Sequence, residues 1–349
     1  MDLGRLKNRP VEWLRGGPEA DVVVSSRVRL ARNIDGYPFV GRASDRQKAR
    51  IEELMQSVLL SLGVDPPLQY VRVDRLEPLQ RELLLERRLI STEHAEADCV
   101  RSVAFDEPEQ TSIMVNEEDH LRLQFMRGGL RLDEVYERAD QFDDKLSERV
   151  PFAFSAKYGY LTACPTNAGT GLRASLMLHL PGVVMAQEMD KVIEVARTER
   201  LALRGVYGEG SHGAGDFYQI SNHVTLGPTE EEIISSVAGA AAKLIALERA
   251  ARQTLYRNHP QEFEHRIRRA LELLRSATTI SSEEALSFLS QVRMGVEMNL
   301  LTETPLETLN ELLLLTLPAH LQTMEGRLLD SSVRNELRAS YVKSRLLTG

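Results

Sequence analysis

The segment Cys164-Pro165-Thr166-Asn167-Ala168-Gly169-Thr170-Gly171-Leu172-Arg173-Ala174-Ser175 combines a thiol, small hydrogen-bonding residues, two glycines and an arginine. Such a run brings backbone N–H donors and a positive charge to one place, which suits an anion. A thiol beside positive charge and oriented donors is favoured as a thiolate. An ordinary glycine-rich turn with a buried cysteine would have a similar composition, so other parts of the chain must decide between the two.

The chain on both sides of this segment alternates short β-like runs with helical patterns from about residue 20 to 228. Helical spacing of apolar residues occurs over 45–62, 132–146 and 183–198. The strand-like runs, bounded by Gly, Pro and Asn, are 21–26, 99–105, 111–115, 120–125, 160–163, 175–180, 202–206 and 217–225. We therefore expect an α+β layer in which helices cover a sheet.

The composition changes after Gly227-Pro228. Thr229 followed by three glutamates is a helix-capping signal, and further helix starts follow at Pro260, Ser281 and Pro305. We predict a short N-terminal segment over 1–21, a mixed domain over 22–254 and an all-α domain over 255–349. The four leucines at 312–315 indicate either a buried helix bundle or a dimer seam, with core packing as the plainer alternative.

Composition narrows the function classes. The chain of 349 residues carries 43 Lys+Arg against 51 Asp+Glu, a net charge of -8, which argues against nucleic-acid binding driven by bulk charge. Residues 1–15 have no apolar signal region, and the longest apolar runs are shorter than the roughly 18 residues of a membrane span. We expect a cytoplasmic protein without a membrane segment. The two cysteines, Cys99 and Cys164, are too few for a disulfide framework.

Arginines and carboxylates form two further motifs. Arg27 and Arg29 follow an apolar run and, two residues apart on a strand, share one face, where they can reach one anion. Solvated arginines on an edge strand are the alternative. Residues 116–122 place three carboxylates, a histidine and an arginine between two strand-like runs. One of these carboxylates can act as a base or grip a cation, whereas a solvated turn is the alternative.

A glycine-rich loop over 204–215 carries Glu209 and is expected to be mobile. It contains a formal G-x-G-x-x-G, but the strand, helix start and later acidic residue of a dinucleotide site are not convincingly placed around it. The chain has no G-x-x-x-x-G-K-[ST] P-loop motif and no H-x-E or C-x-x-C zinc signature.

Taken together and in this order, these blocks resemble the catalytic domain of the phosphagen (guanidino) kinases over about residues 22 to 250. The resemblance implies an antiparallel sheet flanked by helices. The phosphagen kinases of free substrates place a small helical domain before this module, whereas here the helical domain follows it. That order is similar to the bacterial protein arginine kinases, and it implies a dimerisation or regulatory role for 255–349.

The resemblance also implies roles for individual residues. Glu118 and Glu209 would flank the acceptor guanidinium, Glu118 would take its proton, and Cys164 would lie beside it as a thiolate. The glycine-rich loop would close over the bound substrates. Mg²⁺ would be held mainly by ATP phosphates and water, with no protein metal site. The nucleotide positions carried over are Ser25, Ser26, Arg27, Val28, Arg29, Arg88, Arg122, Arg173, Ala174, Ser175, Leu176, Met177, Arg204, Gly205, Val206, Tyr207, Gly208 and Glu209.

The sequence departs from the family pattern at two places. Arg88 stands where related sequences commonly have histidine before Leu-Ile-Ser. The R-D-x-x-R-A motif, understood in the protein kinases of this family as an allosteric phosphoarginine pocket, reads here Arg334-Asn335-Glu336-Leu337-Arg338-Ala339. Asn335 offers no carboxylate to a guanidinium end, while both arginines remain to pair with phosphate.

The resemblance implies an ATP-dependent protein arginine kinase whose phosphoarginine product marks proteins for degradation or regulates a stress response. Its expected partners are proteins with exposed arginines, a second copy in a homodimer, an activator protein and Clp-type protease or chaperone machinery. One alternative is a kinase of free arginine or another small guanidine. A second is an inactive phosphoarginine-binding adaptor that uses Arg334 and Arg338.

Overall fold

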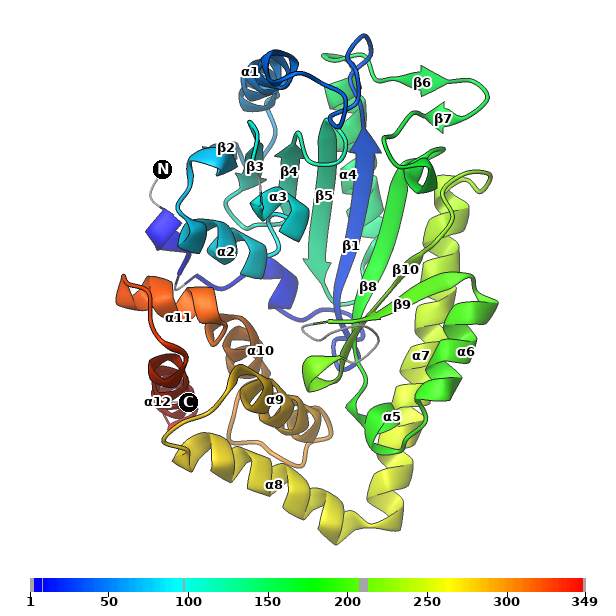
Figure 1. Cartoon of the computed structure of the whole chain (residues 1–349). Helices are drawn as coiled ribbons and strands as arrows, with labels where there is room; N and C mark the ends of the chain where they lie inside the picture. Colours follow the sequence, from blue (N-terminus) through cyan, green and yellow to red (C-terminus); the bar gives the residue numbers. More distant parts are fainter. Residues whose placement is uncertain (1–2, 8, 97, 207–212, 348–349) are drawn as a thin grey trace.

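The computed structural model of the chain describes residues 3–7, 9–96, 98–206 and 213–347. Its centre is an eight-stranded antiparallel sheet with the strand order β2-β3-β4-β5-β1-β8-β10-β9 (Figure 1). The strands are β1 (Val23–Arg32), β2 (Leu68–Arg72), β3 (Ser102–Asp106), β4 (Thr111–Val115), β5 (Leu121–Gly128), β8 (Leu172–His179), β9 (Leu201–Gly205) and β10 (Phe217–Asn222). A separate hairpin pairs β6 (Phe154–Ser155) with β7 (Gly159–Tyr160).

Helices cover one face of this sheet. Ile51, Phe142 and Leu244 come from three of these helices and share one buried core with Val28 and Leu176 of the central strands. The helices of the sheet region are α1 (Asp45–Ser61), α2 (Pro78–Glu86), α3 (Thr92–Ala95), α4 (Leu132–Ser147), α5 (Pro181–Met185), α6 (Met189–Thr198) and α7 (Glu230–Asn258). Of these, α2 packs on the opposite face, where its Leu83 and Leu84 share a smaller core with Val103 and Phe105 of β3. The predicted fold class, an antiparallel sheet flanked by helices and followed by a helical region, is confirmed.

The central strand β1 separates apolar from charged side chains. It pairs with β5 on one side and β8 on the other, and its residues alternate between the sheet faces. Val28 and Leu30 are buried in the core under the helices, whereas Arg27 and Arg29 line a cavity on the other face. The alternation predicted from the sequence therefore places the two arginines together away from the core.

Arg32 ends β1 with a buried ion pair that ties the strand to α4. Its Nε and Nη2 donate to the carboxylate of Asp143 over 2.7 to 3.1 Å, and its Nη1 donates to the Thr170 carbonyl at 2.9 Å. The guanidinium lies over the Tyr160 ring at 3.5 Å from the centroid. A buried charge that is paired and fully hydrogen-bonded is tolerated, and breaking such a pair costs about 3 to 5 kcal/mol.

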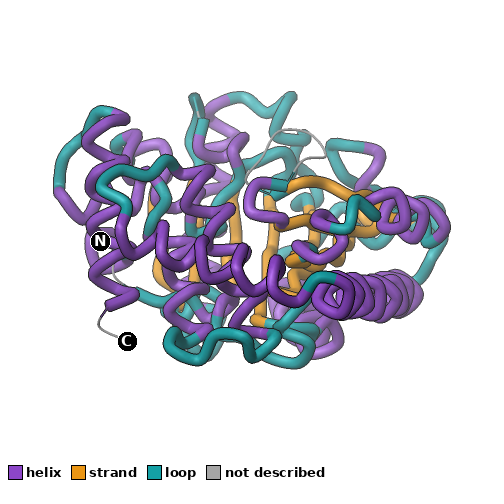
Figure 2. Tube along the Cα trace, turned by 90° about the horizontal axis from the view of Figure 1, so that it is seen from below, coloured by secondary structure: helices purple, strands orange, loops and turns teal. Residues whose placement is uncertain are grey.

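The C-terminal helices lie across one end of the sheet (Figures 1 and 2). They are α8 (Pro260–Ser276), α9 (Ser282–Glu297), α10 (Leu306–Leu315), α11 (Pro318–Glu325) and α12 (Ser331–Leu347). Their buried residues form a second core that includes Trp13 and Leu14 of the N-terminal segment. Leu312 to Leu315 are buried in the chain, as the core-packing alternative expects. Among the described residues, no helix is long and apolar enough to cross a membrane.

The structure differs from the sequence-based expectations at several places. The helix predicted over 183–198 is broken between α5 and α6, where Gln187 has a φ of 57°. Of the run at 160–163, only Tyr160 lies in a strand, as the last residue of β7. The strand Leu68–Arg72 was not predicted, although Pro66 and Pro67 directly precede it. The predicted boundary between 254 and 255 falls inside α7, which ends at Asn258, and the division into domains stays a prediction.

Buried histidines make the fold sensitive to acid. Burial lowers the pKa of each of four histidines, to about 3 for His94, so the folded protein keeps their rings neutral. The four histidines are His94, His120, His179 and His320.

We predict that the melting temperature falls as the pH drops from 7.5 to 5.5. Below about pH 6.5 the unfolded chain binds protons at these rings more readily than the folded chain does, so each ring removes up to about 1.4 kcal/mol of stability per pH unit. Scanning calorimetry across this window measures the effect. A melting temperature that stays constant or rises toward pH 5.5 would contradict the neutral rings.

Candidate active site

A cavity of about 590 Å³ opens on the face of the sheet that the core helices leave free. Arginines from five segments of the chain converge on it: Arg27, Arg29, Arg88, Arg122, Arg173 and Arg204. Glu118, Cys164, Thr166, Asn167 and His223 line the same cavity. The structure thus brings together the arginine strand, the carboxylate turn and the cysteine segment, which are far apart in the sequence.

The register of the sheet explains the convergence of the arginines. Arg29 lies opposite Arg173 on the neighbouring strand, and Arg27 lies opposite Ser175. Arg204 lies opposite Gln219. Arg27 donates from Nη2 to Gln219 Oε1 at 2.6 Å and from Nε to Ser175 Oγ at 3.2 Å, so neutral groups hold it.

The arginine cluster carries more positive charge than its protein partners neutralise. Burial and the neighbouring arginines lower the pKa of Arg27 and Arg173, and they lower the pKa of Arg29 to about 9. Arg29 Nε is buried without a hydrogen-bond partner. A group of guanidiniums in this state favours a polyanion, because a phosphate accepts several charge-assisted hydrogen bonds at once.

The consecutive side chains of the turn between β4 and β5 have different environments. Glu117 is buried and pairs with Arg122, and it also accepts hydrogen bonds from Ser91 Oγ at 2.6 Å and the Glu118 N–H at 2.7 Å. The backbone turns at Asn116, which has a φ of 61°. Glu117 therefore orients an arginine of the cluster, and Glu118 is left to face the cavity.

Glu118 is the exposed carboxylate of this turn. Its side chain is 43% exposed, with Arg122 Nη2 at 3.4 Å and Asn167 Nδ2 at 3.5 Å from Oε2. Partial burial raises its pKa, an effect that Arg122 opposes and the carboxylates of Asp119 and Glu117 reinforce. A carboxylate with a raised pKa is a stronger base, which suits the proton acceptor that the sequence predicts at this position.

The next two residues of the turn hold the cysteine segment and β1. Asp119 Oδ1 accepts from the Ala163 N–H and from Asn33 Nδ2, both at 2.6 Å. His120 accepts from the Ile34 N–H at its Nδ1 and donates from Nε2 to the Pro38 carbonyl, each at 2.9 Å. Asp119 therefore fixes the residue directly before Cys164.

Cys164 lies at the rim of the cavity with a partly buried side chain. Its Sγ is 3.0 Å from Thr166 Oγ1, and its carbonyl accepts from Thr162 Oγ1 at 2.7 Å. Gly169 lies directly against the backbone at Thr225, which follows β10. Only glycine fits there, because a Cβ would lie 2.2 Å from the Thr225 carbonyl oxygen. The thiol is thus held on the same side of the cavity as Glu118 and Asn167.

A small hollow shares the lining residues Arg27 and Arg88 with the main cavity. It is lined by Ser25, Arg27, Arg88, Met126, Ser175, Met177, Val206 and Gln219. Of the predicted nucleotide positions, Ser26, Val28, Ala174 and Leu176 point to the other face, where Ser26 Oγ donates to the Gly129 carbonyl at 2.8 Å and the rest join the core. Their side chains do not reach the cavity, so only a backbone contact remains as a prediction for them.

The remaining predicted positions are divided between described and undescribed residues. Gly205 ends β9 beside Arg204, whereas Tyr207, Gly208 and Glu209 belong to residues 207–212 of the predicted mobile loop, which lie outside the described residues. Arg88 has a φ of 60°, its guanidinium carbon is 5.5 Å from the Trp13 ring centroid, and its carbonyl accepts from Gln124 Nε2 at 2.7 Å.

The predicted phosphoarginine pocket consists of side chains with internal partners. Arg338 is 1% exposed and donates to the Thr316 and Ile280 carbonyls, each at 2.9 Å, and to Asn335 Oδ1 at 2.8 Å. Arg334 donates to the Leu329 carbonyl at 2.6 Å, and Ala339 is buried. Asn335 is thus an acceptor for Arg338, and phosphoarginine binding at these four residues stays a prediction.

Sequence reasoning missed several residues of the site. Gln219, Glu117 and Asp119 position the arginines and the cysteine segment, and His223 and Gln124 line the cavity. Glu117 and Asp119 lay in the charged turn that the sequence indicated, but the family resemblance assigned a role only to Glu118, and the partners of the two buried carboxylates became visible only in the fold. Gln219 lay in a predicted strand and carried no signal of its own.

Comparisons with known proteins agree with this geometry. The model of the ATP:guanido phosphotransferase C-terminal catalytic domain matches residues 50–251, and that of the protein-arginine kinase McsB C-terminal domain matches residues 260–348. The chain is 44% identical over 348 residues to the protein-arginine kinase of Halothermothrix orenii, covering 99% of both chains. It is 43% identical to that of Symbiobacterium thermophilum, covering 96% of both.

Solved structures show the same fold for the sheet region. The duplicated taurocyamine kinase from Schistosoma mansoni with bound transition state analog components aligns with a TM-score of 0.61 at 28% identity, covering 67% of this chain and 34% of that one. A lombricine kinase aligns with a TM-score of 0.60 at 26% identity, covering 70% and 72%. The fold and the cavity define an enzyme that transfers phosphoryl groups. The chain belongs to the ATP:guanido phosphotransferase family, among the protein-arginine kinases.

We predict opposite effects of one substitution at two arginines of β1. Arg29→Gln should raise the melting temperature of the ligand-free protein by a few degrees, because it removes a buried guanidinium repelled by its neighbours, and weaken ATP binding at least tenfold. Arg32→Gln, the matched control, should lower the melting temperature because it leaves Asp143 unpaired. Calorimetric scans and ATP titrations measure both. Equal destabilisation by the two variants, or unchanged ATP affinity in Arg29→Gln, would contradict the assignment.

Proposed function

We propose that this chain is an ATP-dependent protein arginine kinase, which transfers the γ-phosphoryl group of ATP to arginine side chains of proteins. The observation that carries the proposal is the cavity that Arg27, Arg29 and Arg173 line together with a partly exposed carboxylate, Glu118, and a thiol, Cys164. One side of this cavity suits a triphosphate, and the other suits a cationic acceptor.

The arginines act on the phosphates. Phosphoryl transfer requires that charge on the transferring group be neutralised while donor and acceptor are held in line. Arg27 and Arg29 are fixed on β1, Arg173 on β8 and Arg204 on β9, so the sheet holds their guanidiniums before the nucleotide binds. The partnerless Nε of Arg29 fits this role, because a phosphate oxygen supplies its missing acceptor.

Glu118 acts on the acceptor. A guanidinium has a pKa above about 12 and no free lone pair, so a nitrogen must lose a proton as it attacks the γ-phosphorus. In the proposed step the N–P bond forms, the bond from the γ-phosphorus to the bridging oxygen breaks, ADP leaves with that electron pair, and Glu118 takes the proton. Its raised pKa supports this role.

Cys164 and Glu209 complete the proposed acceptor site. Cys164 would lie beside the guanidinium and align the acceptor without forming a covalent bond to it, a role that the family resemblance implies. Glu209 would bind the other edge of the guanidinium and its loop would exclude water, a role that rests on the family resemblance because this residue lies outside the described part of the chain.

A divalent metal ion belongs to the chemistry of this family, and we propose Mg²⁺. Such an ion neutralises phosphate charge and keeps several of its waters, so oxygens of the nucleotide suffice as its other ligands. The described residues contain no cluster of three or more His, Cys, Asp or Glu that could hold a metal. The residues facing the phosphates are cationic, and they fit a metal that enters with ATP.

The choice of a protein acceptor over free arginine rests on the relatives. Their name, protein-arginine kinase, applies to proteins that align with nearly the whole of this chain, including its helical region. The filled cavity positions weigh against an inactive phosphoarginine-binding adaptor. The expected homodimer, the activator protein, the Clp-type machinery, the cytoplasmic location and the role in degradation or stress are carried by the family resemblance.

We predict that the purified chain with Mg-ATP incorporates acid-labile phosphate into arginines of an unfolded protein. Free L-arginine, offered alone at the same guanidine concentration, should be a poor acceptor. Phosphosite mass spectrometry and ³¹P NMR detect the products. Phosphorylation of free arginine alone would establish the small-guanidine alternative, and no transfer with retained phosphoarginine binding would establish the adaptor.

We predict that Glu118→Gln lowers kcat at least 100-fold and changes the KM for ATP less than threefold, because the variant keeps the shape but loses the base. Glu137→Gln, an exposed change on α4 under the other face of the sheet, is the matched control and should leave kcat unchanged. A Glu118→Gln enzyme with a kcat within fivefold of the wild type would exclude Glu118 as the proton acceptor.

A further inference from the structure

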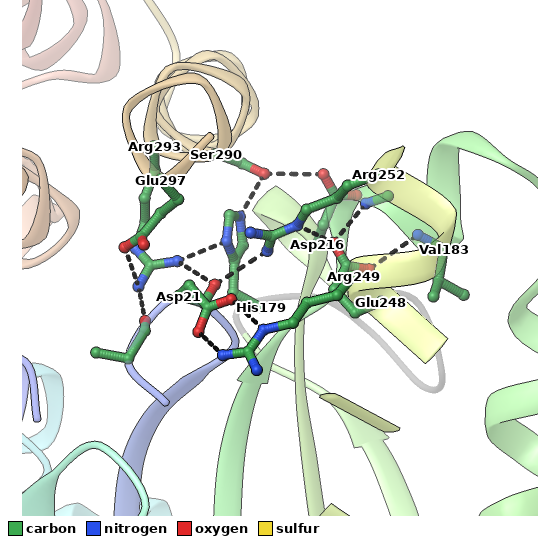
Figure 3. A network of polar contacts seen from close by, with 12 residues as sticks. Asp21, His179, Val183, Asp216, Glu248, Arg249, Arg252, Ser290, Arg293 and Glu297 are labelled. Atoms are coloured by element: carbon green, nitrogen blue, oxygen red, sulfur yellow. Dashed lines mark hydrogen bonds and ion pairs between the residues drawn. The ribbon is translucent and has the colours of Figure 1, made fainter. Parts of the chain in front are cut away.

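A buried chain of polar side chains joins the C-terminal helices to the sheet (Figure 3). Arg293 and Ser290 come from α9, His179 is the last residue of β8, and Asp216 directly precedes β10. His179 and Ser290 are 0% exposed and Arg293 is 1% exposed. None of these four residues lines the cavity, so this series of hydrogen bonds lies outside the site described above.

The hydrogen bonds of this chain run in one direction. Arg293 can only donate, so its Nη1 donates to His179 Nδ1 at 2.7 Å, which leaves the ring proton on Nε2. Nε2 then donates to Ser290 Oγ at 2.8 Å, and the Ser290 hydroxyl donates to Asp216 Oδ2 at 2.9 Å. This series of hydrogen bonds therefore leads from a buried cation through a neutral histidine and a hydroxyl to the partly buried carboxylate of Asp216.

Further hydrogen bonds fix Arg293, the first residue of this series of hydrogen bonds. Its guanidinium also donates to the Asp21 carbonyl at 3.3 Å and to Asn310 Oδ1 at 3.1 Å, and it contacts the Ala20 carbonyl. These partners lie directly before β1 and on α10. The buried polar atoms of these side chains are hydrogen-bonded to one another, so this series of hydrogen bonds holds α9 in one arrangement against the sheet.

Asp216, the last residue of this series of hydrogen bonds, lies close to the residues of the proposed nucleotide site. Asp216 has a φ of 61°, and its carbonyl accepts from the Leu180 N–H at 2.9 Å. Phe217 follows Asp216, pairs with His179 across the sheet and stacks on its ring at 4.7 Å. Gln219 follows Phe217 by two residues on β10. It pairs with Met177 of β8 on one side and with Arg204 of β9 on the other.

We propose that Ser290 of the C-terminal helical region is a positioning residue for the nucleotide site. By holding Asp216 it fixes the start of β10, and with it Gln219, which accepts the hydrogen bond of Arg27 at 2.6 Å. The arginine cluster is thus set in part by a hydroxyl of α9, and the helical region is a structural component of the nucleotide site. The inference rests on the proposed function only in taking the cavity to bind ATP.

Removing the hydroxyl has a definite consequence for both of its neighbours. In Ser290→Ala the Nε2–H of His179 and the carboxylate of Asp216 lose their shared partner inside the protein, where unpaired polar groups are costly. Burial already raises the pKa of Asp216, and Ser290 opposes that shift. Asp216 then gains by turning toward water, which displaces the start of β10.

Binding of Mg-ADP to the full chain, measured by titration calorimetry, tests the inference without any acceptor. Ser290→Ala should weaken binding about tenfold. Ser287→Ala, the same change one turn earlier on α9, should bind Mg-ADP as the wild type does, because Ser287 makes no hydrogen bond to the sheet among the contacts of the described residues. Asp216→Asn should stay within threefold of the wild type, since its side-chain oxygen still accepts from Ser290, whereas Asp216→Ala should match Ser290→Ala.

Equal affinity in Ser290→Ala and Ser287→Ala would overturn the inference, as would an Asp216→Ala protein that binds Mg-ADP normally. If Ser290→Ala does not fold, the two Asp216 variants decide, because only a positioning role separates Asn from Ala in affinity. The proposed function has a separate readout. A wild-type protein that binds Mg-ADP but phosphorylates no protein arginine would refute that function and leave the role of Ser290 intact.

Discussion

The mutual repulsion of the arginines around the cavity is the constraint on which the rest of the structure depends. Arg27, Arg29 and Arg173 lie on adjacent strands, and burial and their neighbours lower the pKa of each. A flexible scaffold would let such charges move apart. An antiparallel sheet, with helices packed on its other face, holds them together and leaves the phosphates of a nucleotide to neutralise them.

The carboxylate turn keeps one acid, Glu118, partly exposed beside the cationic cluster, with Arg122 at 3.4 Å as its ion-pair partner. Glu117 and Asp119 are buried and occupied by Arg122, Asn33 and the Ala163 backbone. Glu118, between them, is the residue left at the rim. A guanidinium substrate is cationic as well, so its place in this cavity is the edge where Glu118 and Cys164 lie, away from the centre of the cluster.

The sequence predicted the parts of this site that local pattern determines. The alternation in β1 placed Arg27 and Arg29 on one face, and the capping signal at Thr229 located the start of α7. Pattern could not reveal contacts between distant segments. The bond from Arg27 to Gln219 spans 192 positions. The family resemblance, and not the local pattern, singled out Glu118, and the partners of Glu117 and Asp119 depend on the fold. Buried partners of the Arg338 guanidinium were equally invisible in the motif.

The central claim is that this cavity receives both substrates, with the phosphates on the arginines and the acceptor at the edge formed by Glu118 and Cys164. A crystal structure of the chain with Mg-ADP and an arginine-containing peptide tests it most directly. The account predicts phosphate oxygens within hydrogen-bonding distance of the cluster and the peptide guanidinium beside Glu118. A nucleotide bound elsewhere, or a guanidinium on the far side of the cluster from Glu118, would contradict it.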